Sequence, residues 1–343
     1  MNASSFMGFG VGMVMLGGLM QGGFAVPMKH MRAWRWENVW LVYSVVGLLV
    51  FPWLLVWATV PGSWEILHQA SGMTLAEIAL FGFGWGVGAV LFGLGINRVG
   101  LALTFAIVPG MSAALGSLLP LLVMHPRYIF TRQGYYFLAG LALVLVGIAV
   151  CAFAGHRRDR KSKEPSDRSD RSSFWVGLLI CVLSGIFSSM LNFSFAFGKS
   201  LQQLTLAAGA RTAMASNLIW ALALTAGFVV NAGYCVFLLQ RNRTWNNFLY
   251  QRKSALLYWG GAAVMGILWF GGLAAYGVGA SALGSMGAVV GWPVFMAIMI
   301  IAGNVFGAVS GEWKGSGRAT HAYTWLGIVV LVAAIYVISR GSS

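Results

Sequence analysis

Long apolar segments separated by short polar ones dominate the pattern along this chain. A helix needs roughly 20 residues to cross the hydrocarbon core of a bilayer. Ten segments reach that length, so we predict an all-α integral membrane protein with ten transmembrane helices. The predicted spans lie near residues 6–28, 37–60, 76–97, 99–124, 133–154, 174–198, 212–239, 255–277, 281–309 and 322–339.

The composition supports this prediction. Of the 343 residues, 59% are hydrophobic and 9% are charged, whereas about a quarter of a soluble domain is charged. The surface must therefore face lipid. A net charge of +14 does not indicate nucleic-acid binding, because the basic residues lie in short segments between apolar runs, where they would meet anionic membrane lipids.

A polar segment at residues 156–173 divides the chain into two halves of five spans. Its composition predicts a disordered cytoplasmic linker between a first repeat at 1–155 and a second at 174–343. Residues 16–19 (LGGL) weakly resemble residues 183–186 (LSGI) at corresponding places. Because five is an odd number, the second repeat must enter from the opposite side, as in many secondary transporters. We therefore predict two inverted five-helix repeats.

Basic residues also predict the orientation in the membrane. Most of the 22 Lys and Arg residues lie in the odd-numbered loops between the predicted spans. The positive-inside rule places those loops in the cytoplasm and both termini on the periplasmic or extracellular side. An even number of spans agrees with this orientation, since it leaves both termini on one side.

Ionisable residues are costly inside a bilayer and often mark function there. The eight acidic residues and five histidines all lie in loops, in the linker or at span ends. We therefore expect no deep carboxylate relay, no metal site and no intramembrane enzyme. Cys151, Cys181 and Cys235 are expected to be buried hydrophobic residues without disulfides. The expected solute is neutral.

Neutral polar and aromatic side chains do occur at bilayer depth. Amides and hydroxyls can bind sugar hydroxyls, and an indole ring can stack on the apolar face of a sugar. Each such residue could instead serve helix packing, because polar side chains often link transmembrane helices. The candidate substrate-binding residues are Gln21, Trp85, Ser188, Asn192, Asn217, Trp220, Trp269, Trp292 and Asn304.

Residues 24–29 (FAVPMK) and 34–40 (WRWENVW) resemble the start of the bacterial L-rhamnose–proton symporter family, within the drug/metabolite transporter superfamily. Residues 85–94, 185–188 and 311–314 fit the same family in the same order. The resemblance implies ten helices in two repeats and import of a sugar across the bacterial inner membrane. It also implies proton coupling without a bound cofactor.

The chain departs from the family pattern in helices three, eight and nine. Ala89 stands where members carry Asn, Gly272 where they carry Gln, and residues 287–289 (GAV) where they carry Tyr-Asp-Tyr. Those polar groups are candidates for holding sugar or proton in the family. Glu312, near a span end in a family-like motif, is a candidate gate or coupling residue here, with simple helix capping as the other interpretation.

The main hypothesis is a secondary transporter of a small neutral polar solute, such as L-rhamnose, working by alternating access. Its central cavity would be lined by spans one, three, four, six, eight and nine. One alternative is an exporter of lipophilic metabolites or drugs from the same superfamily. The other is a non-transporting membrane sensor or assembly protein. No feature of the sequence indicates an oligomeric state.

Overall fold

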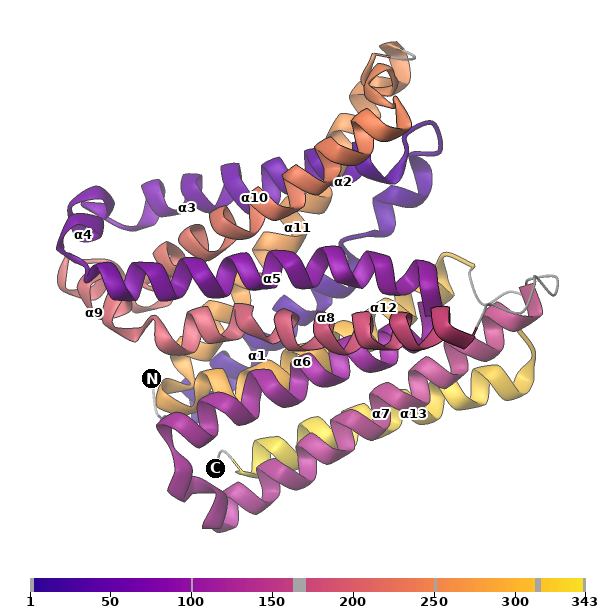
Figure 1. Cartoon of the computed structure of the whole chain (residues 1–343). Coiled ribbons are helices and arrows are strands. Elements are labelled where there is room, and N and C mark those ends of the chain that lie inside the picture. Colours follow the sequence, from indigo (N-terminus) through magenta and orange to yellow (C-terminus); the bar gives the residue numbers. More distant parts are fainter. Residues whose placement is uncertain (1–2, 100, 163–170, 250–251, 312–315, 342–343) are drawn as a thin grey trace.

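The computed structural model describes residues 3–99, 101–162, 171–249, 252–311 and 316–341, and within them every regular element is helical (Figure 1). Ten helical segments are long and apolar enough to cross a membrane, and each overlaps one predicted span. The predicted all-α membrane fold with ten spans is therefore confirmed. Cys151, Cys181 and Cys235 are free and buried, as expected.

Span one is formed by α1 (Ala3–Gly23) and the 3₁₀ turn η1 (Val26–His30). Span two consists of α2 (Trp36–Ser44), the π-helical η2 (Val45–Val50) and α3 (Phe51–Thr59) in succession. Spans three, four and five are α5 (Gly72–Val99), α6 (Leu101–Met124) and α7 (Arg132–Ser162). Spans six to ten are formed by α8 (Arg171–Phe197), α10 (Asn217–Asn242), α11 (Arg252–Ala282), α12 (Gly287–Val309) and α13 (Arg318–Gly341). Two short helices, α4 (Ser63–Gln69) and α9 (Lys199–Ala207), lie between spans.

The predicted polar linker at residues 156–173 is helical at both of its ends. α7 continues to Ser162 and α8 begins at Arg171, while residues 163–170 lie outside the described residues. Arginine and lysine are good helix formers, so α7 can continue past its apolar part into a charged end. Polarity alone therefore did not mark where these helices stop.

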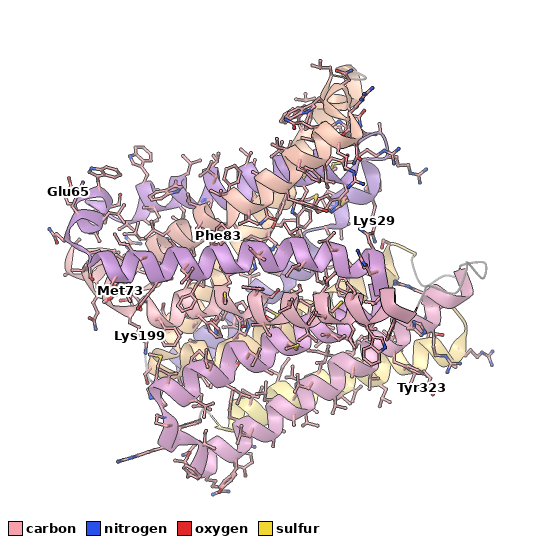
Figure 2. The ribbon with its side chains drawn as sticks, viewed as in Figure 1. Lys29, Glu65, Met73, Phe83, Lys199 and Tyr323 are labelled. Carbon is pink, nitrogen blue, oxygen red and sulfur yellow. The ribbon has the colours of Figure 1, made fainter. Side chains whose placement is uncertain are left out.

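The two ends of the helix bundle differ in charge. Both termini lie at one end, together with α4 and α9, and Glu65 and Lys199 lie there too (Figures 1 and 2). We call this the terminal end. The opposite end carries Lys29, the end of α7 with Arg157 and Arg158, and the start of α13 with Arg318, and we call it the basic end (Figures 1 and 2).

Packing partners recur between the two halves of the chain. α5 packs along α8, so span three contacts span six. The counterpart of this contact in the other half is α11 packed along α1, in which span eight contacts span one. In the same way α6 packs on α8 and α12 packs on α1, while α7 pairs with α13. Counterparts five spans apart run in opposite directions. The pattern is the one expected of inverted repeats, which remain a prediction.

Glycine allows the closest of these contacts. A Cβ atom on Gly47 of η2 would lie 2.8 Å from the Cα atom of Gly266 on α11. A Cβ atom on Gly272 would lie 2.8 Å from the carbonyl oxygen of Gly17 on α1. Such contacts bring helix backbones together where lipid supplies no hydrophobic driving force.

Span two is also tied to span seven by side-chain hydrogen bonds at two depths. Trp40 Nε1 donates to Asn231 Oδ1 at 3.1 Å, and Trp53 Nε1 donates to Thr225 Oγ1 at 2.8 Å. These bonds satisfy polar atoms that would otherwise be unpaired in a bilayer. The two spans therefore form a cross-linked pair.

Candidate solute-binding site

A cavity of about 350 Å³ lies between α1, α6, α7 and α12 and reaches the basic end, where Lys29 and Arg158 lie on its wall. This volume is within the usual range for small-molecule sites. Spans one, four and nine were expected around a central cavity and line this one. Span five also lines it, whereas spans three, six and eight do not. The apolar part of the wall includes Phe24, Phe105, Ile148, Met299, Ile300 and Phe306.

Two of the predicted residues, Gln21 and Asn304, contribute carboxamides to this cavity. Gln21 Nε2 donates to the carbonyl of Trp269 at 3.1 Å, and Asn304 Nδ2 donates to the carbonyl of Ile300 at 2.8 Å. Within the described part of the chain, neither carboxamide oxygen accepts a hydrogen bond. Both oxygens can therefore accept a bond from a solute hydroxyl.

The backbone of span one is interrupted at the cavity. α1 ends at Gly23 and η1 begins at Val26, and residues 24–26 line the cavity wall. Pro27 has no N–H, so it cannot donate to the carbonyl of Gly23 as an ordinary helical residue would. Irregular backbone at membrane depth occurs where it is buried in protein or lines a cavity, and many transporters bind solutes at such breaks.

A predicted tryptophan, Trp269, lies next to Gln21, and a second, Trp85, packs on Trp269. The rings of Trp269 on α11 and Trp85 on α5 have centroids 5.1 Å apart and are inclined by 35°. Trp269 also contacts Tyr43 of α2 edge-on, at 6.1 Å. Trp85 is half-buried and Trp269 is buried. The structure thus brings Gln21, Trp269 and Trp85 together near the middle of spans one, eight and three.

The terminal end is closed by a second group, the terminal-end cluster of Asn192, Phe195, Trp220, Tyr276, Trp292 and Phe295. Asn192 is at its centre. Its Nδ2 donates to the carbonyls of Gly116 at 2.8 Å and Ala288 at 2.9 Å. Its Oδ1 accepts from the Tyr276 hydroxyl at 2.5 Å. A single side chain on α8 therefore joins α6, α11 and α12.

Aromatic rings fill the rest of the terminal-end cluster. Trp220 stacks on Phe195, with centroids 5.3 Å apart and planes 5° from parallel. Trp292 stacks on Phe295 at 5.5 Å and donates from Nε1 to the carbonyl of Ser112 at 3.0 Å. Three predicted residues, Asn192, Trp220 and Trp292, thus meet at this closed end.

The remaining predicted residues lie apart from both groups. Asn217 Nδ2 donates to Thr59 Oγ1 at 3.0 Å and so links spans seven and two at the terminal end. Ser188 is half-buried where α8 touches α5, and a Cβ atom on Gly88 would lie 2.8 Å from its backbone nitrogen. Glu312 lies outside the described residues.

Two residues that the sequence did not single out have central positions. Tyr276 is fully buried in the terminal-end cluster. Among the described residues, Glu37 is the only buried acidic side chain. Its Oε1 accepts from Asn242 Nδ2 at 3.0 Å and Thr244 Oγ1 at 2.9 Å, which ties the start of α2 to the turn after α10. In the sequence, the polar run that follows span seven was the signal that could have indicated partners for Glu37.

Comparison with known proteins agrees with this architecture. Residues 1–343 match the family described as L-rhamnose-proton symport protein. The L-rhamnose-proton symporter of Salmonella typhi is 26% identical over 323 residues, which cover 93% of each chain. The symporter of the same description from Klebsiella pneumoniae subsp. pneumoniae is 25% identical over the same length and share. The chain therefore belongs to the L-rhamnose-proton symport protein family, a family of transporters rather than enzymes.

Proposed function

We propose that this protein imports a small neutral sugar, such as L-rhamnose, together with protons, by alternating access. One observation carries the proposal. The cavity that holds Gln21 and Asn304 reaches the basic end, while the terminal-end cluster closes the other end. A protein open at one end and closed at the other has the arrangement that alternating access requires.

The lining of the cavity fits a solute of mixed polarity. The carboxamide oxygens of Gln21 and Asn304 can accept from hydroxyls, and Lys29 and Arg158 can donate to them. L-rhamnose carries a methyl group in place of a hydroxymethyl group, so one side of the molecule suits the apolar wall. The relatives named above are L-rhamnose-proton symporters, which supports both the sugar and the proton.

Coupling to protons requires a group that gains and loses a proton. The cavity wall includes no carboxylate among the described residues. Glu312, which follows α12 in the sequence, is therefore still proposed as a gate or coupling residue.

The distribution of Lys and Arg supports a cytoplasmic basic end and outward termini, with residues 1–155 and 174–343 as inverted repeats. A C-terminal reporter that fluoresces only in the cytoplasm should stay dark, and a bright signal would refute this orientation.

The apolar wall also fits the second candidate, an exporter of lipophilic metabolites. The two are separated by uptake of labelled L-rhamnose into proteoliposomes, with and without an imposed pH gradient. We expect uptake that the gradient accelerates. Efflux of a hydrophobic dye without any sugar uptake would favour the exporter. No flux of either compound would favour a sensor or assembly protein.

The same assay tests the site. Gln21→Ala and Asn304→Ala each remove one hydrogen-bonding group from the cavity, so each should raise KM for the sugar about threefold to tenfold. Gln240→Ala, at an exposed position near the end of α10, is the matched control and should leave KM unchanged. Wild-type KM in both cavity variants would remove these residues from the site.

A further inference from the structure

Several buried polar atoms without partners belong to the terminal-end cluster or to residues near it in the sequence. Within the described residues, the hydroxyls of Ser112, Ser117 and Ser216 and the indole N–H of Trp220 have no hydrogen-bond partner. All four side chains are at most 2% exposed. Leaving such a group unpaired costs about 1–3 kcal/mol, so most buried polar atoms in proteins are paired. Two such residues on α6 and two at the start of α10 require an explanation.

Two of these atoms face one point beside the terminal-end cluster, and the other two belong to residues of α6, the helix whose backbone carbonyls bind the cluster. A Cβ atom on Gly277 would lie 2.5 Å from Trp220 Nε1 and 2.8 Å from Ser216 Oγ, so both atoms face the same point on α11, next to Tyr276. Ser112 and Ser117 belong to α6. Ser112 gives its carbonyl to Trp292, and Ser117 follows Gly116, whose carbonyl accepts from Asn192.

We propose that the terminal-end cluster is the sugar-binding site of the opposite, outward-open state, seen here in its collapsed form. The proposal rests on the function proposed above. Asn192 holds α6 and α12 together through two backbone carbonyls. When those helices separate, its carboxamide and the Tyr276 hydroxyl are released, and the four unpaired atoms gain access to a ligand.

The chemistry of the cluster defines its ligand. The amide, the phenol, the indole N–H and the serine hydroxyls offer hydrogen bonds to several hydroxyl groups. The stacked pairs Phe195–Trp220 and Trp292–Phe295 offer flat apolar surfaces for the CH faces of a sugar ring. None of the residues that form the cluster is charged, which favours a neutral polyhydroxylated solute.

A packing role and a binding role predict opposite effects of mutation. If the unpaired atoms serve only packing, then Trp220→Phe and Ser216→Ala remove a defect without loss to transport. If they bind sugar, the same changes weaken binding from the terminal-end side. Ser216→Ala should not lower stability in either case, because no hydrogen bond within the described protein is lost. Trp220→Phe leaves a cavity against Phe195, so it should lower stability in either case, and only its effect on transport separates the two roles. Ser44→Ala is a matched control, since Ser44 is equally buried and unpaired but lies on α2 near the basic end.

The experiment measures sugar uptake by vesicles whose outer face carries the terminal end, and the melting temperature of each variant in detergent. We expect Trp220→Phe and Ser216→Ala to raise KM about threefold to tenfold, with Ser216→Ala at unchanged melting temperature and Ser44→Ala at wild-type KM. Wild-type KM in both variants, or an equal shift in Ser44→Ala, would overturn the assignment. So would a lower melting temperature in Ser216→Ala, because its hydroxyl would then have a structural partner. Wild-type protein that moves no sugar would instead refute the proposed function.

Discussion

Replacing Tyr276 with Phe removes one oxygen atom from the centre of the terminal-end cluster. The Tyr276 hydroxyl is the only donor to Asn192 Oδ1 among the described residues. The phenyl ring of Phe would keep the contacts of Tyr276 with Trp220 at 6.1 Å and Trp292 at 5.3 Å. The substitution therefore isolates a single hydrogen bond that holds this end closed.

The size of the effect follows from the Asn192 oxygen, which the substitution leaves without a donor. Asn192 is fully buried, so its oxygen would lose its partner without gaining water. Such an unpaired acceptor costs about 1–3 kcal/mol. In the open state water reaches the same oxygen and the cost disappears. The equilibrium between closed and open terminal ends should therefore shift toward open by about 5- to 150-fold.

The assay is the rate at which a membrane-impermeant maleimide labels Ser117→Cys from the terminal-end side. Ser117 is fully buried in the closed state, so labelling reports opening. The three native cysteines are replaced by alanine in this background. Tyr276→Phe should raise the rate at least fivefold, and Tyr258→Phe, on the same helix near the basic end, should not. An unchanged rate for Tyr276→Phe would refute the reasoning that this bond holds the end closed.

Two further predictions concern the basic end. Gly155 lines the cavity and a Cβ atom there meets nothing within 4 Å, so Gly155→Leu should fill the cavity and cut sugar uptake at least about tenfold at unchanged melting temperature. Gly233→Leu, equally unobstructed on α10, is the control, and normal uptake by Gly155→Leu would exclude this cavity from the pathway. Glu37→Ala removes the acceptor shared by Asn242 and Thr244 and should destabilise the protein by about 1–3 kcal/mol in detergent, with Glu37→Gln restoring much of the loss. Equal melting temperatures for wild type and Glu37→Ala would contradict this role.

The spans could be predicted because a membrane helix is defined by local composition and length alone. The same logic singled out Gln21 and Asn304, which line the cavity, since a polar group at bilayer depth is costly and stands out in an apolar run. It could not separate Gln21 from Asn217. Both are amides in predicted spans, yet the partner of Asn217 is Thr59, 158 residues away, and only the packing of spans two and seven reveals it.

Tyr276 and Glu37 show what local pattern misses. Tyr276 is an aromatic residue in an aromatic-rich span. Its importance comes from its hydrogen bond to Asn192 on α8, 84 residues earlier in the chain. From the sequence, Glu37 was expected only to stand at a span end. Its partner Thr244 reaches it because Arg243 adopts a left-handed conformation, with φ of 54°, at the end of α10. Such a turn depends on tertiary contacts and is uncommon outside glycine.

The bonds between spans two and seven constrain how the protein can change state. Trp40–Asn231, Trp53–Thr225 and Thr59–Asn217 join the two spans at successive depths through the membrane. Three hydrogen bonds along their shared length oppose both sliding and separation of the two spans. The distance between spin labels on α2 and α10 should therefore stay constant throughout the cycle. The distance from either span to α13 should change, because spans two and seven tilt as one unit.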